Sequence, residues 1–224
     1  MALDKVQWAH TNNKTIEAIK FGDLDPACTA KITQASETKK IVFMAIPSFS
    51  YKEWILKTTQ LLTEKNHRIG YVTFVWSPEL LTKDFEEFNR KNPDKIRQEK
   101  IFFIDGTRKK NPPQKGLLSR LGLGGEKDSL NRIYLESFKN AQTLSNEVIT
   151  SLKDDVVDIA LIDTLAMLSY YWGDNMQVLR FAHNLIHSLL DKKIRAVFPF
   201  PIETSSIELA RDLQMFAESV IIIK

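Results

Sequence analysis

Residues 41–53 have the sequence Ile41-Val42-Phe43-Met44-Ala45-Ile46-Pro47-Ser48-Phe49-Ser50-Tyr51-Lys52-Glu53. The first six are all apolar, which predicts a buried strand. From residue 51 the sequence changes to a helical period, and one face of the predicted helix carries Trp54, Ile55, Thr58, Leu61 and Leu62. The stretch therefore predicts a strand, a short loop and a helix that packs on the sheet to which the strand belongs.

The same alternation continues outward to the end of the chain. We expect strands at 68–75, 101–105, 156–163, 194–199 and 219–223, and helices at 51–65, 78–90, 129–152, 174–191 and 205–216. Most of these strands are apolar throughout, as strands are when both faces of a parallel sheet are covered. Residues 40–224 are thus predicted to form a doubly wound α/β domain, with a mostly parallel sheet and helices on both faces. Residues 1–39 are predicted to be an N-terminal extension or edge element, with a short helix around residues 14–20.

The composition favours a protein of the cytoplasm. The chain has 224 residues, of which 43% are hydrophobic and 26% charged, as expected for a soluble domain with a full core. Its single cysteine, Cys28, excludes an internal disulfide and a cysteine-rich metal site. No apolar run approaches the ~18 residues of a membrane span, and the N-terminus lacks a signal-peptide pattern. We therefore expect a cytoplasmic protein without membrane insertion and without a metal site.

The loop at residues 46–53 stands where a phosphate-binding loop carries GxxxxGK[ST], between a strand and a helix. When Lys52 is placed on the lysine of that motif, Ile46 and Tyr51 replace its two glycines. Glu53 then replaces the Ser or Thr. The glycines let backbone N–H groups curl around phosphate, and the hydroxyl holds Mg²⁺. The residues present here supply neither property, which indicates a phosphate loop that has lost its chemistry.

Ser50 and Glu53 have the spacing of a capping box. In that motif the serine accepts a hydrogen bond from the third helical amide, and the glutamate bonds back to the amide of the serine. The carboxylate would then complement the helix N-terminus, where a nucleotide phosphate would otherwise bind. We therefore predict a structural role for Glu53.

A second nucleotide-site pattern lies in the strand that ends at Asp163. An apolar strand followed by an aspartate orients Mg²⁺ in P-loop NTPases. A strand-end aspartate that caps the following turn explains the same pattern, and the sequence leaves both interpretations open. We treat Lys52, Glu53 and Asp163 as relic positions of a nucleotide site.

The order and spacing of these segments resemble the RecA/KaiC-like ATPase core, especially the KaiC-type proteins of archaea. The resemblance covers about residues 40–224, and beyond the loop and the Asp163 strand it rests on the segments 72–74, 77–81, 104–106, 158–164, 178–189, 205–213 and 220–223. It implies a RecA-like fold with a nucleotide crevice. The family carries an acidic pair after its second strand to activate water, where this chain has Val75 and Trp76. Polar phosphate sensors are replaced by the segment 198–201, which reads Phe-Pro-Phe-Pro.

One segment is strongly biased in charge. The loop at 108–120 contains five cations, together with glycines and a proline pair, and its cations are Arg108, Lys109, Lys110, Lys115 and Arg120. Such a loop either contacts an anionic partner or is simply solvated. No aromatic residue interleaves the cations for base stacking, so we expect nucleic-acid binding there to be weak.

The resemblance and its departures together imply a catalytically inactive RecA/KaiC-like protein, a pseudo-ATPase without a cofactor. Such a protein would act as a regulatory or structural partner of other proteins, including an active homologue or a second copy of itself. Two alternatives stay open. One is an ATPase that binds ATP and Mg²⁺ through Lys52 and Asp163 with an unusual phosphate loop. The other is a nucleic-acid-binding RecA paralogue that uses the basic loop at 108–120.

Overall fold

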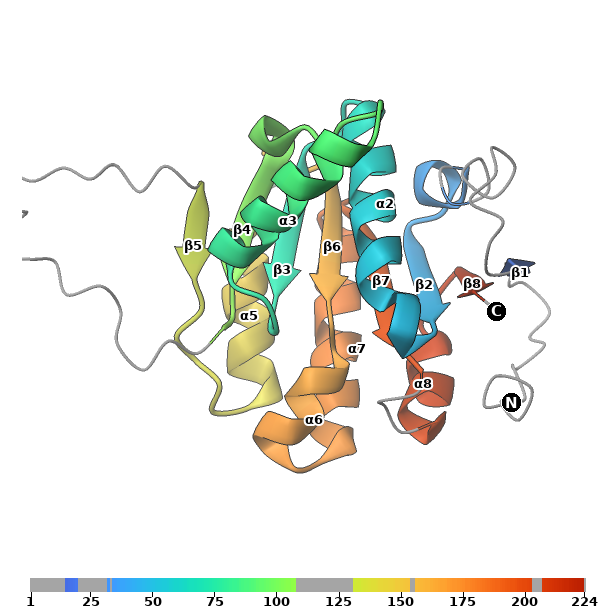
Figure 1. Ribbon diagram of the computed structural model, residues 1–224. Helices are drawn as coiled ribbons and strands as arrows, with labels where there is room; N and C mark the ends of the chain where they lie inside the picture. The colour runs from blue at the N-terminus through green and yellow to red at the C-terminus, as the bar shows by residue number, and fades with distance from the viewer. Residues whose placement is uncertain are drawn as a thin grey trace, which may run out of the picture.

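The structure of the protein is a computed structural model that describes residues 15–19, 32, 34–107, 131–153, 156–202 and 207–223. These residues form an eight-stranded sheet in the order β1-β8-β2-β7-β6-β3-β4-β5, with every pairing parallel (Figure 1). The strands are β1 (Thr15–Ile19), β2 (Ile41–Ile46), β3 (Ile69–Thr73), β4 (Ile101–Asp105), β5 (Arg132–Tyr134), β6 (Ile159–Asp163), β7 (Arg195–Pro201) and β8 (Ser219–Ile223).

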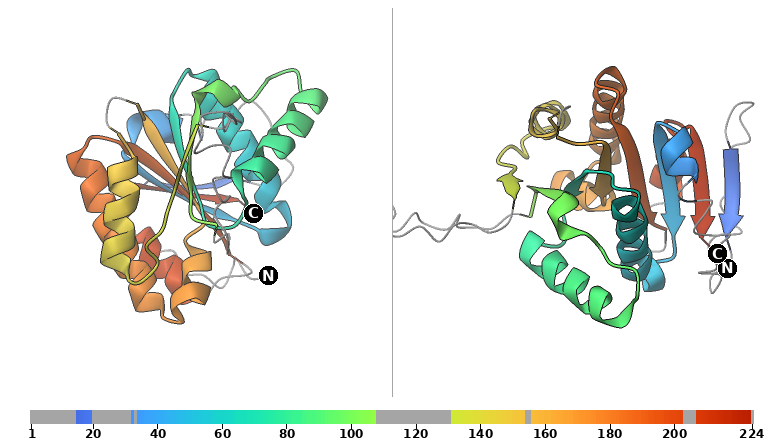
Figure 2. Two further views of the ribbon diagram at one scale, coloured as in Figure 1. Left: turned by 90° about the vertical axis from the view of Figure 1, so that its left-hand side faces the viewer. Right: turned by 90° about the horizontal axis from the view of Figure 1, so that it is seen from above.

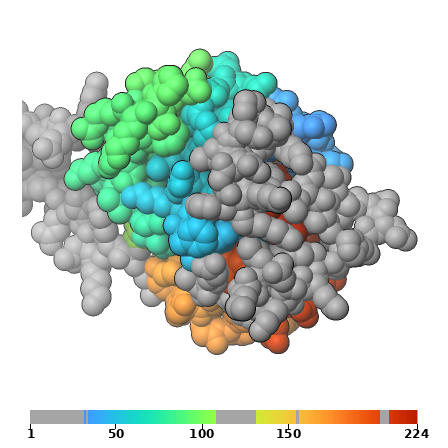
Figure 3. All heavy atoms as spheres, turned by 45° about the vertical axis from the view of Figure 1, so that its right-hand side comes forward, coloured from blue at the N-terminus to red at the C-terminus, as the bar shows by residue number. Residues whose placement is uncertain are grey.

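Helices cover both faces of the sheet, which confirms the doubly wound α/β architecture (Figure 2). One face carries α2 (Tyr51–Glu64) and α3 (Pro78–Lys91), which form part of the surface seen in Figure 3. The other carries α5 (Ala141–Ser151), α7 (Asn175–Asp191) and α8 (Ile207–Gln214). The described residues also include the short helix α6 (Ala166–Trp172), the 3₁₀ turns η2 (Ser48–Ser50) and η3 (Gln98–Lys100), and a helical segment at 34–38.

The core has two layers, one on each side of the sheet. Beneath α2 and α3 it contains Trp54, Tyr71 and Phe85, and on the opposite side it contains Leu144 and Phe181 among many aliphatic residues. Strands β2, β3, β6 and β8 are buried along their whole length, as the continuous apolar runs predict. In the described part of the chain, no helix combines the length and the apolar character that crossing a bilayer requires.

Two expectations about secondary structure are wrong, and one helix was missed. The region 129–152 is not one helix, because Arg132–Tyr134 pairs with β4 as an edge strand and α5 starts only after the N-cap Asn140. The segment around 14–20 contains the edge strand β1 rather than a helix, because it extends the sheet beside β8. The helix α6, which follows β6 directly, was not expected.

The parallel arrangement brings the carboxyl ends of the central strands to one edge. In the order β2-β7-β6-β3, the loops after all four strands lie side by side there. Helix α2 begins at the same edge, immediately after η2. Asp163 ends β6 in register with Thr73, the last residue of β3. In open α/β sheets this edge is where ligands bind.

Candidate functional site at the carboxyl edge of the sheet

Two tyrosine hydroxyls enclose the carboxylate of Asp163. The Tyr51 hydroxyl donates to Oδ1 at 2.6 Å, and the Tyr71 hydroxyl donates to Oδ2 at 3.0 Å. Asp163 and Tyr71 are fully buried, and Tyr51 is 6% exposed. Both carboxylate oxygens are therefore occupied by donors from the protein itself.

The fold fixes both tyrosines from different elements. Tyr51 is the first residue of α2, and its ring lies 6.0 Å from the ring of Trp76, between centroids. Tyr71 lies in β3, beside β6, and its ring packs against Phe85 and Phe103 at centroid distances of 6.3 and 5.8 Å. Because each ring is held by aromatic packing, each hydroxyl is held at the carboxylate.

Burial dominates the electrostatics of this cluster. It raises the pKa of Asp163 to about 6, while the hydrogen bonds from Tyr51 and Tyr71 act in the opposite direction. Burial also raises the pKa of both tyrosines well above 10.0, and the negative charge of Asp163 adds to that effect. The two tyrosines therefore stay protonated, and remain donors, across the physiological range of pH.

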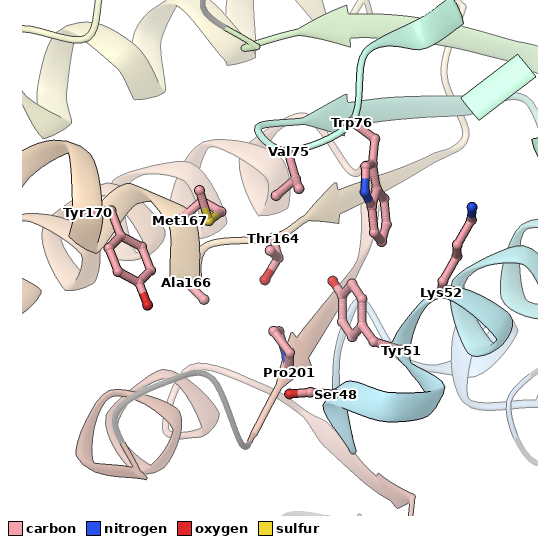
Figure 4. Close-up of a pocket in the computed structure, with 10 residues that line it drawn as sticks. All are labelled: Ser48, Tyr51, Lys52, Val75, Trp76, Thr164, Ala166, Met167, Tyr170 and Pro201. Carbon is pink, nitrogen blue, oxygen red and sulfur yellow. The ribbon is translucent and has the colours of Figure 1, made fainter. Parts of the chain in front are cut away.

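Lys52 lies beside the cluster but does not join it. Its Nζ forms an ion pair with Asp84 of α3 at 2.7 Å, and its side chain is 51% exposed. In Figure 4 the Lys52 ammonium points away from the neighbouring cavity. The positions predicted as nucleotide-site relics thus do not form one constellation: Lys52 pairs with α3, Asp163 is held by tyrosines, and Glu53 is exposed on α2.

The predicted capping box does not form. The Ser50 side chain accepts no hydrogen bond from the helix, and its hydroxyl instead donates to the carbonyl oxygen of Pro47 at 3.2 Å. The reason is the 3₁₀ turn η2, which runs directly into α2 and leaves Ser50 at φ −110° and ψ 2°. An N-cap serine needs an extended backbone to reach the amides of the first turn. Glu53 consequently has no capping partner in Ser50.

A cavity of about 440 Å³ opens beside the tyrosine cluster (Figure 4). It lies between η2, the start of α2, the loop after β3, the end of β7 and helix α6. Its lining residues are Ser48, Tyr51, Lys52, Val75, Trp76, Thr164, Ala166, Met167, Tyr170 and Pro201. Most of these side chains are apolar or aromatic. Within the described residues, the buried hydroxyl oxygen of Ser48 has no hydrogen-bond partner.

The sequence pointed to only part of this site. The motif comparison identified Tyr51 as the residue at a glycine position of the phosphate loop, but it did not predict the hydrogen bond to Asp163. Neither Tyr71 nor the residues of α6 were predicted to belong to the site. A signal for Tyr71 was present, because a tyrosine inside an otherwise apolar, doubly covered strand needs a buried acceptor for its hydroxyl. The cations of the predicted basic loop, Arg108 to Arg120, lie outside the described residues.

Metal binding has no support in the described part of the chain. Within the residues that the structure describes, no group of three or more His, Cys, Asp or Glu side chains is arranged to hold a metal ion. Asp163 is the only one of the predicted relic carboxylates that is buried, and its two oxygens already accept hydrogen bonds.

No family model matches this chain, and no curated protein matches its sequence. The fold and the site define a doubly wound α/β protein. At the carboxyl edge of its sheet, two tyrosine hydroxyls bond to a buried carboxylate, and a mostly apolar cavity lies beside them.

Proposed function

We propose that this protein is a RecA/KaiC-like domain that has lost ATP hydrolysis and acts as a regulatory or structural protein-interaction module. The observation that carries the proposal is the closure of Asp163 by Tyr51 and Tyr71. The placement of the loop after β2 and of Asp163 at one edge supports the RecA-like part of the proposal, since a nucleotide site requires that proximity.

The closed carboxylate is unsuited to magnesium. Mg²⁺ demands near-octahedral oxygen coordination and keeps several of its waters, so its carboxylate ligand must face solvent or substrate. Asp163 has no exposed surface, and two buried tyrosine rings stand over its oxygens. Freeing the carboxylate would break the hydrogen bond that the buried Tyr71 hydroxyl donates to Oδ2, which costs free energy in the core.

The loop after β2 is equally unsuited to phosphate. It contains no glycine, and its residues 48–50 form the turn η2. The side chain of Tyr51 occupies the place that a glycine would leave open, and the charge of Lys52 is compensated by Asp84. A triphosphate would therefore meet an aromatic ring and a paired lysine instead of free amides and a free ammonium group.

What the edge offers instead is apolar surface. Tyr170 of α6 is 71% exposed, and Val75 in the loop after β3 is 36% exposed, and both also line the cavity. Exposed large apolar side chains that gather at one site are typical of interaction surfaces. We propose that the partner is another protein, either an active RecA/KaiC-like homologue or a second copy of this chain.

A photo-crosslinking experiment tests this function. A photoreactive phenylalanine analogue is placed at Tyr170 in the full chain, expressed in the native host, and at Asp94 as a control. Asp94 is exposed and follows α3 at the opposite edge of the sheet. We expect one discrete adduct from position 170, lost when Val75→Asp is added, and none from position 94. Equal adducts from both positions, or none from position 170, would contradict an interaction surface at this edge.

A further inference from the structure

We infer that the partner bound at the carboxyl edge of the sheet is a second copy of this chain, related by a two-fold axis. In this dimer the Tyr170 ring of each copy covers the cavity of the other. The inference rests on the proposed function, because it names the partner of the interaction surface proposed there. Of that proposal it uses the interaction surface alone, and it does not depend on the loss of ATP hydrolysis.

The segments that surround the cavity carry no charge. The segments 47–51, 74–78 and 164–173 supply all of its lining residues except Lys52 and Pro201. None of the three contains Asp, Glu, Lys, Arg or His, although 26% of the chain is charged, and each contains Tyr, Trp or Phe. Depletion of charge together with enrichment of aromatic residues is typical of the centre of a protein–protein interface, and homodimer interfaces are more apolar than those of transient complexes.

The charged residues that border these segments are engaged within the chain. Lys52 is bonded to Asp84 at 2.7 Å, and Glu79 forms an ion pair with Arg132. Asp174 is the N-cap of α7, where its side chain accepts a hydrogen bond from the helix. The edge therefore suits a partner surface that is itself uncharged, and the same edge of a second copy meets that condition. Because each copy has a net charge of +3, an uncharged patch is also where repulsion between two copies is smallest.

The same surface holds both a cavity and an exposed ring beside it. Tyr170 of α6 is 71% exposed, and it stands across the cavity from Tyr51 and Trp76 (Figure 4). The volume of about 440 Å³ lies in the range of sites for drug-sized ligands, roughly 300–1,000 Å³, so the cavity has room for one aromatic side chain. A two-fold interface joins one patch to itself, so every contact occurs twice. An exposed ring beside a cavity meets this requirement, because two copies can cover each other's cavities at once.

Sedimentation equilibrium of the full chain tests the inference. We expect the wild type to reach twice its chain mass of 25.8 kDa. Val75→Asp and Tyr170→Lys each place a charge at an exposed position of the uncharged surface, and each should weaken self-association by roughly 10-fold or more. Met215→Asp is the matched control, because Met215 is 63% exposed and lies between α8 and the start of β8, at the opposite edge of the sheet. A wild type that stays monomeric at high micromolar concentration would overturn the inference, as would a Met215→Asp variant that is as defective as Val75→Asp.

Mixing the two variants tests the reciprocal contact. In a two-fold dimer of Val75→Asp with Tyr170→Lys, the introduced carboxylate faces the introduced ammonium group on one side, and native Val75 and Tyr170 meet on the other. We therefore expect native mass spectrometry to detect a heterodimer in the mixture, although each variant alone is monomeric. The mixture of Val75→Asp with Val75→Lys is the control for charge attraction and should remain monomeric. No heterodimer in the first mixture, or an equal amount in the second, would overturn the inference.

The outcome is separable from that of the proposed function. A monomeric wild type whose photoreactive position 170 captures a different protein would remove the inference and leave the interaction surface standing. A dimer that the two edge variants disrupt, in a protein that ATP·Mg stabilises, would support the inference and contradict the loss of nucleotide binding.

Discussion

The hydroxyl of Tyr51 lies 2.6 Å from Oδ1 of Asp163, so the first residue of α2 closes the carboxylate at the end of β6. These residues stand 112 positions apart in the chain. In a nucleotide-binding fold the same two places would hold a glycine beside phosphate and a carboxylate beside Mg²⁺. Here the two side chains bond directly to each other, and both belong to the core.

Replacing Tyr51 with phenylalanine should destabilise the protein measurably. The change removes a hydrogen bond to a buried carboxylate, a class of bond that contributes about 1.5–3 kcal/mol. We expect a loss of that size in the free energy of unfolding, measured by urea denaturation at neutral pH. Tyr170→Phe is the matched control, because Tyr170 is 71% exposed and its hydroxyl should contribute little. Equal stabilities for the two variants would contradict the described geometry.

The contribution of Asp163 to the free energy of unfolding should fall as the pH rises from about 4 to about 6. The pKa of Asp163 is about 6 in the folded state, against 3.8 for an ordinary aspartate. The folded state therefore binds more protons than the unfolded state in this window, and raising the pH favours unfolding. The pKa difference of about 2 corresponds to roughly 3 kcal/mol.

The pH effect is isolated by comparison with Asp163→Asn, which cannot titrate at this position. We expect the free energy of unfolding of the wild type to drop by about 2–3 kcal/mol relative to the variant between pH 4 and pH 7. Urea denaturation across that range measures the difference. A difference that stays constant, or that grows in favour of the wild type with rising pH, would show that the carboxyl group is not buried as described.

Glu53→Ala should have only a small effect on stability. Because the capping box is absent, only the interaction of an exposed carboxylate with the helix dipole is lost, about 0.3–0.5 kcal/mol. Asn140→Ala is the contrast, since Asn140 accepts from the amide of Thr143 at the start of α5, at 2.9 Å. Its loss should cost about 1 kcal/mol. A larger loss of unfolding free energy for Glu53→Ala than for Asn140→Ala would indicate that the capping box does form.

The fold was largely accessible from the sequence because its central strands are buried on both faces. Strands β2, β4 and β8 have the predicted bounds, since continuous apolar runs mark such strands clearly. The edge strand β5 was missed because its three residues, Arg132 to Tyr134, are only partly buried and show no apolar run. Helix α6 was missed because seven residues are too few to display a helical period.

The site was less accessible, because its contacts join residues that are distant in the chain. Asp163 was found from its strand, and Tyr51 from its place in the loop. The sequence did not reveal that these two side chains meet, because that depends on β2 and β6 lying two strands apart in the sheet. The capping box was predicted from spacing alone, whereas the turn η2 that prevents it depends on the backbone conformation of residues 48–50.

The central claim is that the nucleotide site is closed, and the thermal midpoint in the presence of ATP·Mg tests it most directly. A ligand that binds only the folded state at 100 times its Kd stabilises that state by about 2.7 kcal/mol, a shift of several degrees. We predict that millimolar ATP·Mg leaves the midpoint of the wild type unchanged. A rise of several degrees would contradict this claim if Lys52→Ala abolishes it. Lys57→Ala, which changes a lysine further along α2, is the control and should preserve such a rise.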